Sequence, residues 1–314
     1  MPEPIVECVP NFSEGRRLEV IDDILRSMQA VPGVFILDRH SDPDHNRTVI
    51  TMAGNPKSME EAALAAIACA SRRIDLSRHS GVHPRIGATD VVPFVPLQGS
   101  SRAECIPLAR RVGQRAGEEL GIPVYLYEDA ALLPARRNLA AVRLGQYEGL
   151  CNAIRDDPLR KPDYGPAFLG PAGATAIGVR GPLIAFNVFL ETERVDTARA
   201  VARAIRESSG GLPHLKALGL LVRNRGQVSM NLTDYTQTSI QQAYEAVQHE
   251  TKRQGVRIAW SEIVGLVPEA AMRGVDPVYL KIENFSPDII LEKRMAKAGM
   301  RYSATDAPQP DRTV

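Results

Sequence analysis

The segment from Ser77 to Asp90 carries the densest group of reactive side chains in the sequence. Its fourteen residues include two histidines, two arginines and an aspartate, together with two glycines and a proline. Glycine and proline predict a loop rather than a helix, and polar groups gathered in a loop between core elements are typical of a functional site. Imidazole titrates near neutral pH, so His79 and His83 are candidate proton-transfer groups. The alternative interpretation is a solvated, well-capped turn.

A metal site is a weaker interpretation of the same histidines. His79 and His83 have the i, i+4 spacing that binds zinc on a helix, but Gly81 and Pro84 argue against a helix here. The cysteines lie far apart and form no CxxC pair, so neither a zinc ribbon nor a redox dithiol is expected. They are predicted to be small core residues in a reducing cytosol: Cys8, Cys69, Cys105 and Cys151.

A second polar cluster runs from Asp38 to Arg47 and connects two predicted strands. It contains Asp38, His40, Asp44 and Arg47. One interpretation is a charged hairpin turn. The other is a second wall of the same pocket, because both clusters lie at strand ends.

A third segment, Tyr164 to Gly178, is rich in glycine and proline. It is not a GxGxxG sequence and follows no predicted strand, so a nicotinamide dinucleotide site is not supported. The chain also has no GxxxxGK[ST] motif and therefore no P-loop. The segment is interpreted either as an interdomain linker or as a backbone-lined wall where glycine lets a flat ligand approach closely.

The elements that must position these clusters follow one order twice. In the first half, apolar spacing predicts strands at 5–9, 34–37, 47–52, 91–96 and 124–127 and helices at 16–29, 58–73 (capped by Ser58) and 101–120. In the second half it predicts strands at 183–190, 218–223, 227–232 and from 256 toward 265, with helices at 197–207 and 238–253. The strands 218–223 and 227–232 are expected to form a hairpin that turns around Arg225-Gly226. The second half and the first six elements of the first half read β-α-β-β-α-β, the ferredoxin-like order. The sequence predicts an α/β fold of two α+β sandwiches joined by a flexible, glycine-rich connector over 158–182.

The domain boundaries follow from this order. We expect an N-terminal subdomain over 1–180 with the reactive loop, a C-terminal subdomain over 181–300, and a disordered polar tail over 301–314.

The chain has 38 Lys+Arg residues and 37 Asp+Glu residues, and this near balance argues against a nucleic-acid partner. The N-terminus lacks the features of a signal peptide, and Ala62 to Ala70 is too short to span a bilayer. A cytoplasmic protein without a membrane partner is expected.

The sequence resembles the glutamate formimidoyltransferase family, also called formiminotransferases, over roughly residues 4 to 300. Members transfer the formimidoyl group of N-formimidoyl-L-glutamate to tetrahydrofolate in histidine breakdown. The runs that carry the resemblance are 6–15 (VECVPNFSEG), 46–48 (NRT), 77–90 (SRHSGVHPRIGATD), 123–127 (PVYLY), 162–178, 183–187 (LIAFN) and 261–268 (SEIVGLVP).

The resemblance implies two ferredoxin-like βαββαβ subdomains whose mixed sheets face each other across a folate-binding tunnel. It places the catalytic histidine at His83. The folate-binding loop is implied at Gly165, Pro166, Ala167, Phe168, Leu169, Gly170, Pro171, Ala172 and Gly173. Candidate substrate-binding residues are His40, Asp38, Asp44, Arg47, Arg78, His79 and Arg85. Tetrahydrofolate is expected as co-substrate, formimidoylglutamate as the second substrate, no metal or nicotinamide, and a homodimer.

The chain differs from the animal members of this family in three respects. Animal relatives carry an aspartate where this chain has His40, so that Asp38 or Asp44 is expected to replace it. The connector is also one residue shorter, and the chain ends before the cyclodeaminase domain of the animal enzymes, so transfer alone is expected.

The expected chemistry needs one proton-transfer group and anchors for carboxylates. N5 of tetrahydrofolate attacks the amidine carbon, and His83 is expected to remove a proton from N5 and return one to the leaving glutamate nitrogen. Arg78, Arg85 and Arg47 are expected, in that order, to bind the glutamate carboxylates of the two substrates. Formyl transfer between 5-formyltetrahydrofolate and glutamate, a non-catalytic folate-binding protein and a metal-dependent hydrolase remain open.

Overall fold

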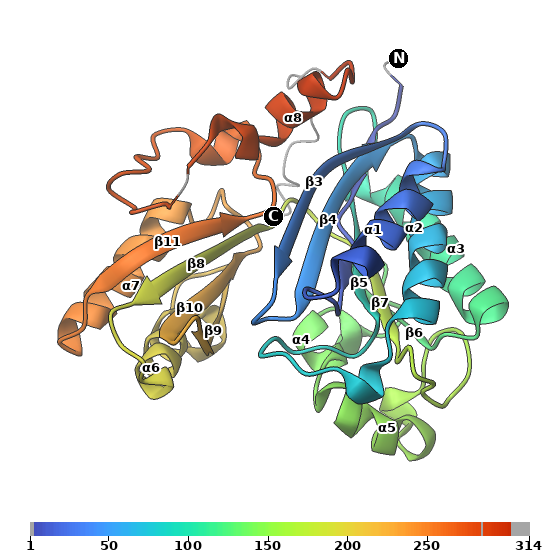
Figure 1. The fold of residues 1–314 in the computed structure, drawn as a ribbon, viewed down its shortest axis with the longest axis horizontal. Helices are drawn as coiled ribbons and strands as arrows, with labels where there is room; N and C mark the ends of the chain where they lie inside the picture. Colours follow the sequence, from blue (N-terminus) through green and yellow to red (C-terminus); the bar gives the residue numbers. More distant parts are fainter. Residues whose placement is uncertain (1–2, 284, 303–314) are drawn as a thin grey trace. The chain divides into compact units, whose positions relative to one another are not determined.

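A computed structural model describes residues 3–283 and 285–302 of the chain (Figure 1). It divides into two compact units, the first running to Arg180 and the second spanning Gly181–Arg301. Most of the expected disordered tail, residues 303–314, lies outside the described residues. No helix in the described ranges combines the length and apolar character needed to cross a membrane.

The first unit is built on a seven-stranded mixed sheet. Its strands are β1 Val6–Cys8, β2 Asn11–Phe12, β3 Val34–Asp42, β4 Arg47–Gly54, β5 Thr89–Pro96, β6 Val124–Glu128 and β7 Thr175–Val179. β1 and β2 each pair with both β4 and β5, so they act as one interrupted strand between them. β3 lies at one edge beyond β4, and β7 and β6 run parallel to β5 on the other side. The first six elements therefore have the predicted ferredoxin-like order.

Three helices cover one face of this sheet: α1 Leu18–Gln29, α2 Pro56–Arg73 and α3 Arg102–Leu120 (Figure 1). α1 buries Ile21, Ile24 and Met28, which lie one helical turn apart. α2 begins two residues before the predicted start, because Asn55 rather than Ser58 is its N-cap and accepts a hydrogen bond from the Ser58 amide. α3 begins with a capping box of Ser101 and Glu104.

The prediction of a flexible connector over 158–182 is wrong near its C-terminal end. Residues Thr175–Val179 form β7, a fully buried strand hydrogen-bonded to β5 and β6 on its two sides. Gly178 is required by packing, because a Cβ there would lie 2.5 Å from the Tyr127 ring. The glycine that suggested a linker thus marks close contact in the core.

Two helices between β6 and β7 were not predicted from the sequence: α4 Leu139–Val142 and α5 Gln146–Asp156. They cover part of the sheet face opposite α1–α3 and bury Val142, Leu150 and Ile154 against Tyr125 and Tyr127. Short 3₁₀ turns occur at Leu76–Arg78, Pro134–Arg136 and Pro158–Arg160.

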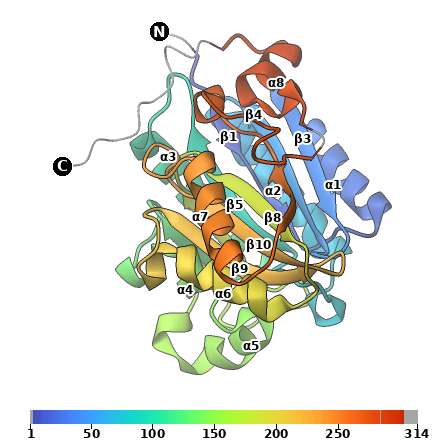
Figure 2. The same cartoon turned by 90° about the vertical axis from the view of Figure 1, so that its left-hand side faces the viewer.

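The second unit is a complete ferredoxin-like sandwich. Its elements are β8 Ile184–Leu190, α6 Val195–Ile205, β9 Leu215–Val222, β10 Arg225–Leu232, α7 Ile240–Arg253 and β11 Ile258–Val264. The sheet order is β11-β8-β10-β9, and every pair is antiparallel, whereas a mixed sheet was expected. Figure 2 shows α6 and α7 side by side over one face of this sheet.

The predicted hairpin of the second unit is present, with its turn displaced by two residues. Val222 pairs with Arg225, so the turn residues are Arg223 and Asn224, both with positive φ. This is the geometry of a tight hairpin turn whose twist matches the strands. A 3₁₀ turn at Glu207–Ser209 follows α6. After β11 the unit continues through 3₁₀ turns at Glu269–Met272 and Pro287–Ile289 to α8 Leu291–Lys297.

Candidate functional site

The reactive loop and the glycine-rich segment lie side by side in the first unit. The Leu76 amide donates to Pro171 O at 2.7 Å, the Ala88 amide to Ala172 O at 2.8 Å, and the Ala174 amide to Ile86 O at 2.9 Å. These backbone hydrogen bonds hold both ends of the loop against the segment. The structure therefore joins the first and third clusters of the sequence into one site.

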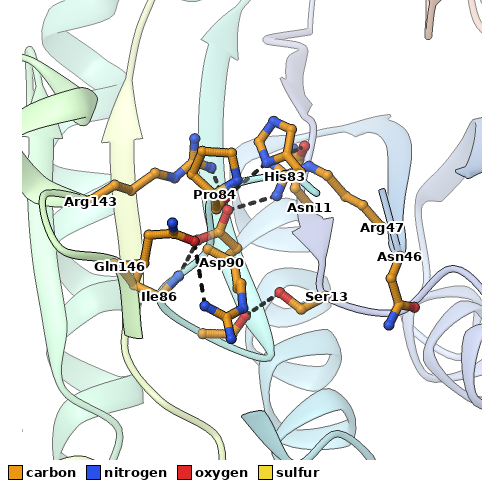
Figure 3. Close-up of polar contacts among 12 residues, drawn as sticks. Asn11, Ser13, Asn46, Arg47, His83, Pro84, Ile86, Asp90, Arg143 and Gln146 are labelled. Atoms are coloured by element: carbon orange, nitrogen blue, oxygen red, sulfur yellow. Dashed lines mark hydrogen bonds and ion pairs between the residues drawn. The ribbon is translucent and has the colours of Figure 1, made fainter. Parts of the chain in front are cut away.

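His83 presents one ring nitrogen for proton transfer. Its Nδ1 lies 2.8 Å from the Pro84 carbonyl oxygen, which can only accept, so Nδ1 carries the proton. In this tautomer Nε2 has a lone pair, and no group among the described residues forms a hydrogen bond with it. As a residue His83 is half-buried, and the His45 ring lies 5.8 Å from its ring, centroid to centroid. Figure 3 shows the His83 ring beside Pro84.

His79 differs from His83 because both of its ring nitrogens have protein partners. Arg85 Nε donates to His79 Nδ1 at 3.2 Å, so Nε2 carries the proton and donates to Asn46 O at 3.0 Å. Burial, more than the nearby Arg85 charge, lowers the pKa of His79. A neutral imidazole with both nitrogens engaged holds neighbouring segments together and has no lone pair for a substrate.

A buried carboxylate, Asp90, anchors two arginines below His83. Asp90 Oδ2 accepts from Arg47 Nη1 at 2.7 Å and from Arg143 Nη2, while its Oδ1 accepts from the Ile86 amide at 2.9 Å. Arg47 Nη2 also donates to Asn11 Oδ1 at 2.8 Å. In Figure 3 the two arginines approach Asp90 from opposite sides. Burial raises the pKa of Asp90, but the charges of Arg143 and Arg47 outweigh it and keep the carboxyl ionised.

The charges of Arg47 and Arg143 also affect the pKa of His83. Burial has the largest effect, and the positive charges of Arg47 and Arg143 and the neighbouring His45 add to it, so the pKa of His83 lies well below its ordinary value. At neutral pH the imidazole is therefore neutral. The site offers a general base that needs no prior deprotonation.

Arg85 forms an ion pair with a different carboxylate, that of Glu148. Its Nη1 and Nη2 donate to the two oxygens of Glu148 at 2.8 and 2.6 Å, a bidentate pair. The hydrogen bonds from Arg85 lower the pKa of Glu148 to about 2. Together with its contact to His79, this pair ties the loop to α5. Arg78, in contrast, has an 88% exposed side chain whose nearest carboxylate, Asp75, is 3.7 Å away.

The second cluster is only partly joined to the loop. Arg47 reaches Asp90, and the Val82 amide donates to Asp44 O at 3.3 Å. Asp38 and His40 belong to β3 and not to the connection between strands, since β3 extends to Asp42 along the full length of β4. They pair with Thr51 and Val49, which alternate with Arg47 along β4, so both lie on the same face of the sheet as Arg47.

The predicted folate-binding segment is ordered and largely backbone-lined. Phe168 is 52% exposed, and with Leu169 it borders a cavity of about 280 Å³ whose other lining residues come from α5: Cys151, Asn152 and Arg155. Gly173 has φ +67, and a Cβ there would lie 2.2 Å from Ile86 O. Glycine at this position is what lets the segment approach the reactive loop.

Sequence reasoning missed three residues of the site: Asn11, Arg143 and Glu148. Arg143 ends α4, and Glu148 lies in the first turn of α5, two helices that were not predicted. Asn138, which caps α4 by accepting from the Ala140 amide, was the available signal. Within residues 3–283 and 285–302, no group of three or more His, Cys, Asp or Glu side chains is placed to hold a metal ion.

Known proteins are similar to this chain along nearly its whole length. Residues 5–180 match the family described as "Formiminotransferase domain, N-terminal subdomain", and residues 185–300 match "Formiminotransferase domain". The chain is similar to a protein of Thermoplasma acidophilum named "Glutamate formimidoyltransferase", with 48% identity over 298 residues, covering 94% of this chain and 98% of that protein.

Two further relatives extend this comparison. A "Glutamate formimidoyltransferase" of Streptococcus pyogenes serotype M1 is 44% identical over 284 residues, covering 90% of this chain and 95% of the relative. The pig "Formimidoyltransferase-cyclodeaminase" is 42% identical over 289 residues, which cover 89% of this chain and 53% of that protein.

Proposed function

Because the chain belongs to the formiminotransferase family, we propose that it is a glutamate formimidoyltransferase. It transfers the formimidoyl group of N-formimidoyl-L-glutamate to N5 of tetrahydrofolate and releases L-glutamate and 5-formimidoyltetrahydrofolate. The names of relatives with 44–48% identity over nearly their full length support this assignment. The observation that carries it is the neutral His83 imidazole with Nε2 unengaged by the described residues.

His83 is the proton shuttle of the proposed reaction. As N5 attacks the amidine carbon, a C–N bond forms, and His83 Nε2 takes the proton that N5 loses. The resulting imidazolium then gives this proton to the glutamate nitrogen, and the bond between that nitrogen and the amidine carbon breaks. One imidazole thus serves as base and then as acid, a contribution of about 10²–10⁴-fold in rate.

The surrounding charges favour rapid return of the proton. Arg47 and Arg143 disfavour a positive charge on His83, so the imidazolium is a strong acid toward the departing nitrogen. Asp90 limits this effect by neutralising one of the two positive charges. His79 holds the loop in place through Asn46 and Arg85 and takes no part in proton transfer.

Tetrahydrofolate is proposed to bind along Gly165–Gly173. Three backbone hydrogen bonds tie this stretch and the residues around it to the ends of the reactive loop, which supports placing the reacting N5 near His83. The exposed Phe168 offers an apolar surface to a flat ring system. Alignment of the two substrates would supply a large part of the remaining rate enhancement.

Turnover with the purified protein tests the proposal. Formation of 5-formimidoyltetrahydrofolate from formimidoylglutamate and tetrahydrofolate is expected, and dialysis against a chelator is expected to leave the rate unchanged. A parallel reaction with 5-formyltetrahydrofolate and glutamate tests the alternative formyl transfer. Binding of folate without turnover of either donor would contradict the proposal, and so would loss of activity on chelation that zinc restores.

A further inference from the structure

The arginines beside His83 carry more positive charge than the protein neutralises. Arg47 and Arg143 form ion pairs with the same oxygen, Oδ2 of Asp90. The other oxygen of Asp90 is occupied by the Ile86 amide. No further carboxylate within the described residues forms a salt bridge with either arginine. Two guanidinium groups therefore share one negative charge in a largely buried environment.

Arg143 also has a buried donor without an acceptor. Its Nε is inaccessible to solvent, and among the described residues no group accepts a hydrogen bond from it. The side chain as a whole is 14% exposed. A buried, charged donor that lacks a partner costs considerable free energy, so the position favours an anion from outside the chain.

The other arginines of the site do not offer this combination. Arg85 is matched by the bidentate Glu148, and Arg78 is 88% exposed. Arg47 donates to both Asp90 and Asn11. Of the arginines considered, Arg143 is the one with an unmatched donor next to an excess of positive charge.

The position of Arg143 also indicates which part of a substrate it meets. Arg143 and Arg47 both bind Asp90, whose other oxygen accepts from the Ile86 amide three residues after His83, and Figure 3 shows this group next to His83. In formimidoylglutamate a single carbon separates the reacting nitrogen from the α-carboxylate, whereas three carbons separate it from the γ-carboxylate. A carboxylate held close to the proton-transfer group is therefore the α-carboxylate.

We propose that Arg143, supported by Arg47, binds the α-carboxylate of the glutamate donor and holds its nitrogen at His83. This inference rests on the proposed function and assigns the donor-binding arginine within that site. Arg143 takes the place of Arg78 and Arg85 as the principal carboxylate anchor, and Arg47 keeps a supporting role.

Two amide analogues of the donor test the assignment directly. One is the formimidoyl derivative of isoglutamine, whose α-carboxylate is an amide, and the other is formimidoylglutamine, whose γ-carboxylate is an amide. The unmodified enzyme is expected to use the α-amide with a kcat/KM about 10- to 100-fold lower than the γ-amide, because a charged hydrogen-bonded pair is lost. Equal use of the two amides, or preference for the α-amide, would overturn the proposal.

Substitution of Arg143 completes the test. Arg143→Gln is expected to lower kcat/KM for formimidoylglutamate about 10- to 100-fold, to leave KM for tetrahydrofolate nearly unchanged, and to abolish the discrimination between the amides. Arg160→Ala is the matched control. Arg160 donates to Ala141 O and Leu144 O at the end of the same helix but does not touch Asp90. An equal loss in Arg160→Ala would show that α4 matters only structurally.

A binding measurement separates this inference from the proposed function. If the unmodified protein shows no turnover, the proposed function fails, and calorimetric titration with L-glutamate still tests the anion site. Weaker glutamate binding by Arg143→Gln than by the unmodified protein supports the site, and equal binding refutes it. If Arg143→Gln does not fold, Arg143→Lys keeps the ion pair to Asp90 but removes the Nε donor, and the same comparisons apply.

Discussion

At the scale of single residues, two histidines of the same loop have different hydrogen-bond partners. Both ring nitrogens of His79 form hydrogen bonds, with Arg85 and with Asn46 O, whereas only Nδ1 of His83 does so, with the carbonyl oxygen of the next residue. A general base needs a lone pair that can reach the substrate. The hydrogen-bond pattern therefore favours His83 for proton transfer and gives His79 a structural role.

Paired alanine variants test this division. His83→Ala is expected to lower kcat by a factor of about 10² or more with little change in folate affinity, because a proton shuttle is removed. His79→Ala is expected to lower kcat less and to reduce the free energy of unfolding by about 1–3 kcal/mol, because Arg85 and Asn46 lose a partner. Steady-state kinetics and urea denaturation measure both. Near-normal turnover of His83→Ala, with loss in His79→Ala, would reverse the assignment.

The pH dependence of the reaction follows from the charges around His83. Burial and the nearby Arg47, Arg143 and His45 depress its pKa, so the active neutral form persists below the ordinary histidine value of about 6.5. We expect kcat/KM to stay level from neutral pH down through 6.5 and to fall only in more acidic solution. NMR titration of the His83 ring, assigned with His83→Gln, checks this independently of substrate ionisation. A midpoint at or above about 6.5 would contradict the expectation.

At the scale of elements, the site depends on contact between a loop and a glycine-rich segment far apart in the sequence. The loop precedes β5, and the segment precedes β7, the strand next to β5 in the sheet. Parallel neighbouring strands bring their preceding segments to the same edge of a sheet. Direct backbone hydrogen bonds between loop and segment then fix the distance between them.

Gly173 and Gly170 provide a matched pair for testing this contact. In Gly173→Ala the new Cβ would lie 2.2 Å from Ile86 O at φ +67, whereas a Cβ at Gly170 meets nothing within 4 Å. Gly173→Ala is expected to lose about 1–3 kcal/mol of unfolding free energy and to bind folate more weakly. Gly170→Ala is expected to keep the unfolding free energy of the unmodified protein. Urea denaturation measures this difference and fluorescence titration with folate measures the weaker binding by Gly173→Ala; equal stability of the two variants would contradict the expectation.

At the scale of the whole molecule, two sandwiches of the same element order use different sheets. The first unit extends its ferredoxin-like core with β6 and β7, which run parallel to β5, and carries the site residues described above. The second unit keeps the four antiparallel strands of the basic pattern. The extension of the first sheet is what brings the proposed folate-binding segment next to the loop that holds His83.

Family resemblance also leads us to propose a homodimer. Light scattering at micromolar concentration is expected to give about twice the chain mass of 34.3 kDa. A value near 34.3 kDa across that range would contradict the proposal. Sedimentation velocity over a dilution series provides the control, because a specific dimer dissociates at a defined concentration.

The sequence alone determined the βαββαβ order at the core of each unit and the reactive loop. Regular apolar spacing identified α1, α2, α3, α6 and α7. The concentration of histidine, arginine and glycine between Ser77 and Asp90 identified the loop that holds His83. These features are local, because they depend on residues close together in the chain.

Only the tertiary structure decided which side chains share the site. Arg143, Glu148 and Asn11 reach it through contacts between residues 36 to 63 positions apart, and no local pattern encodes such a separation. The structure also showed that Arg85 already has a partner and that His40 and Asp38 lie along β3. The roles of Gly178 and of His79 likewise depend on neighbours supplied by distant segments, since packing and hydrogen-bond partners are set by the fold and not by sequence spacing.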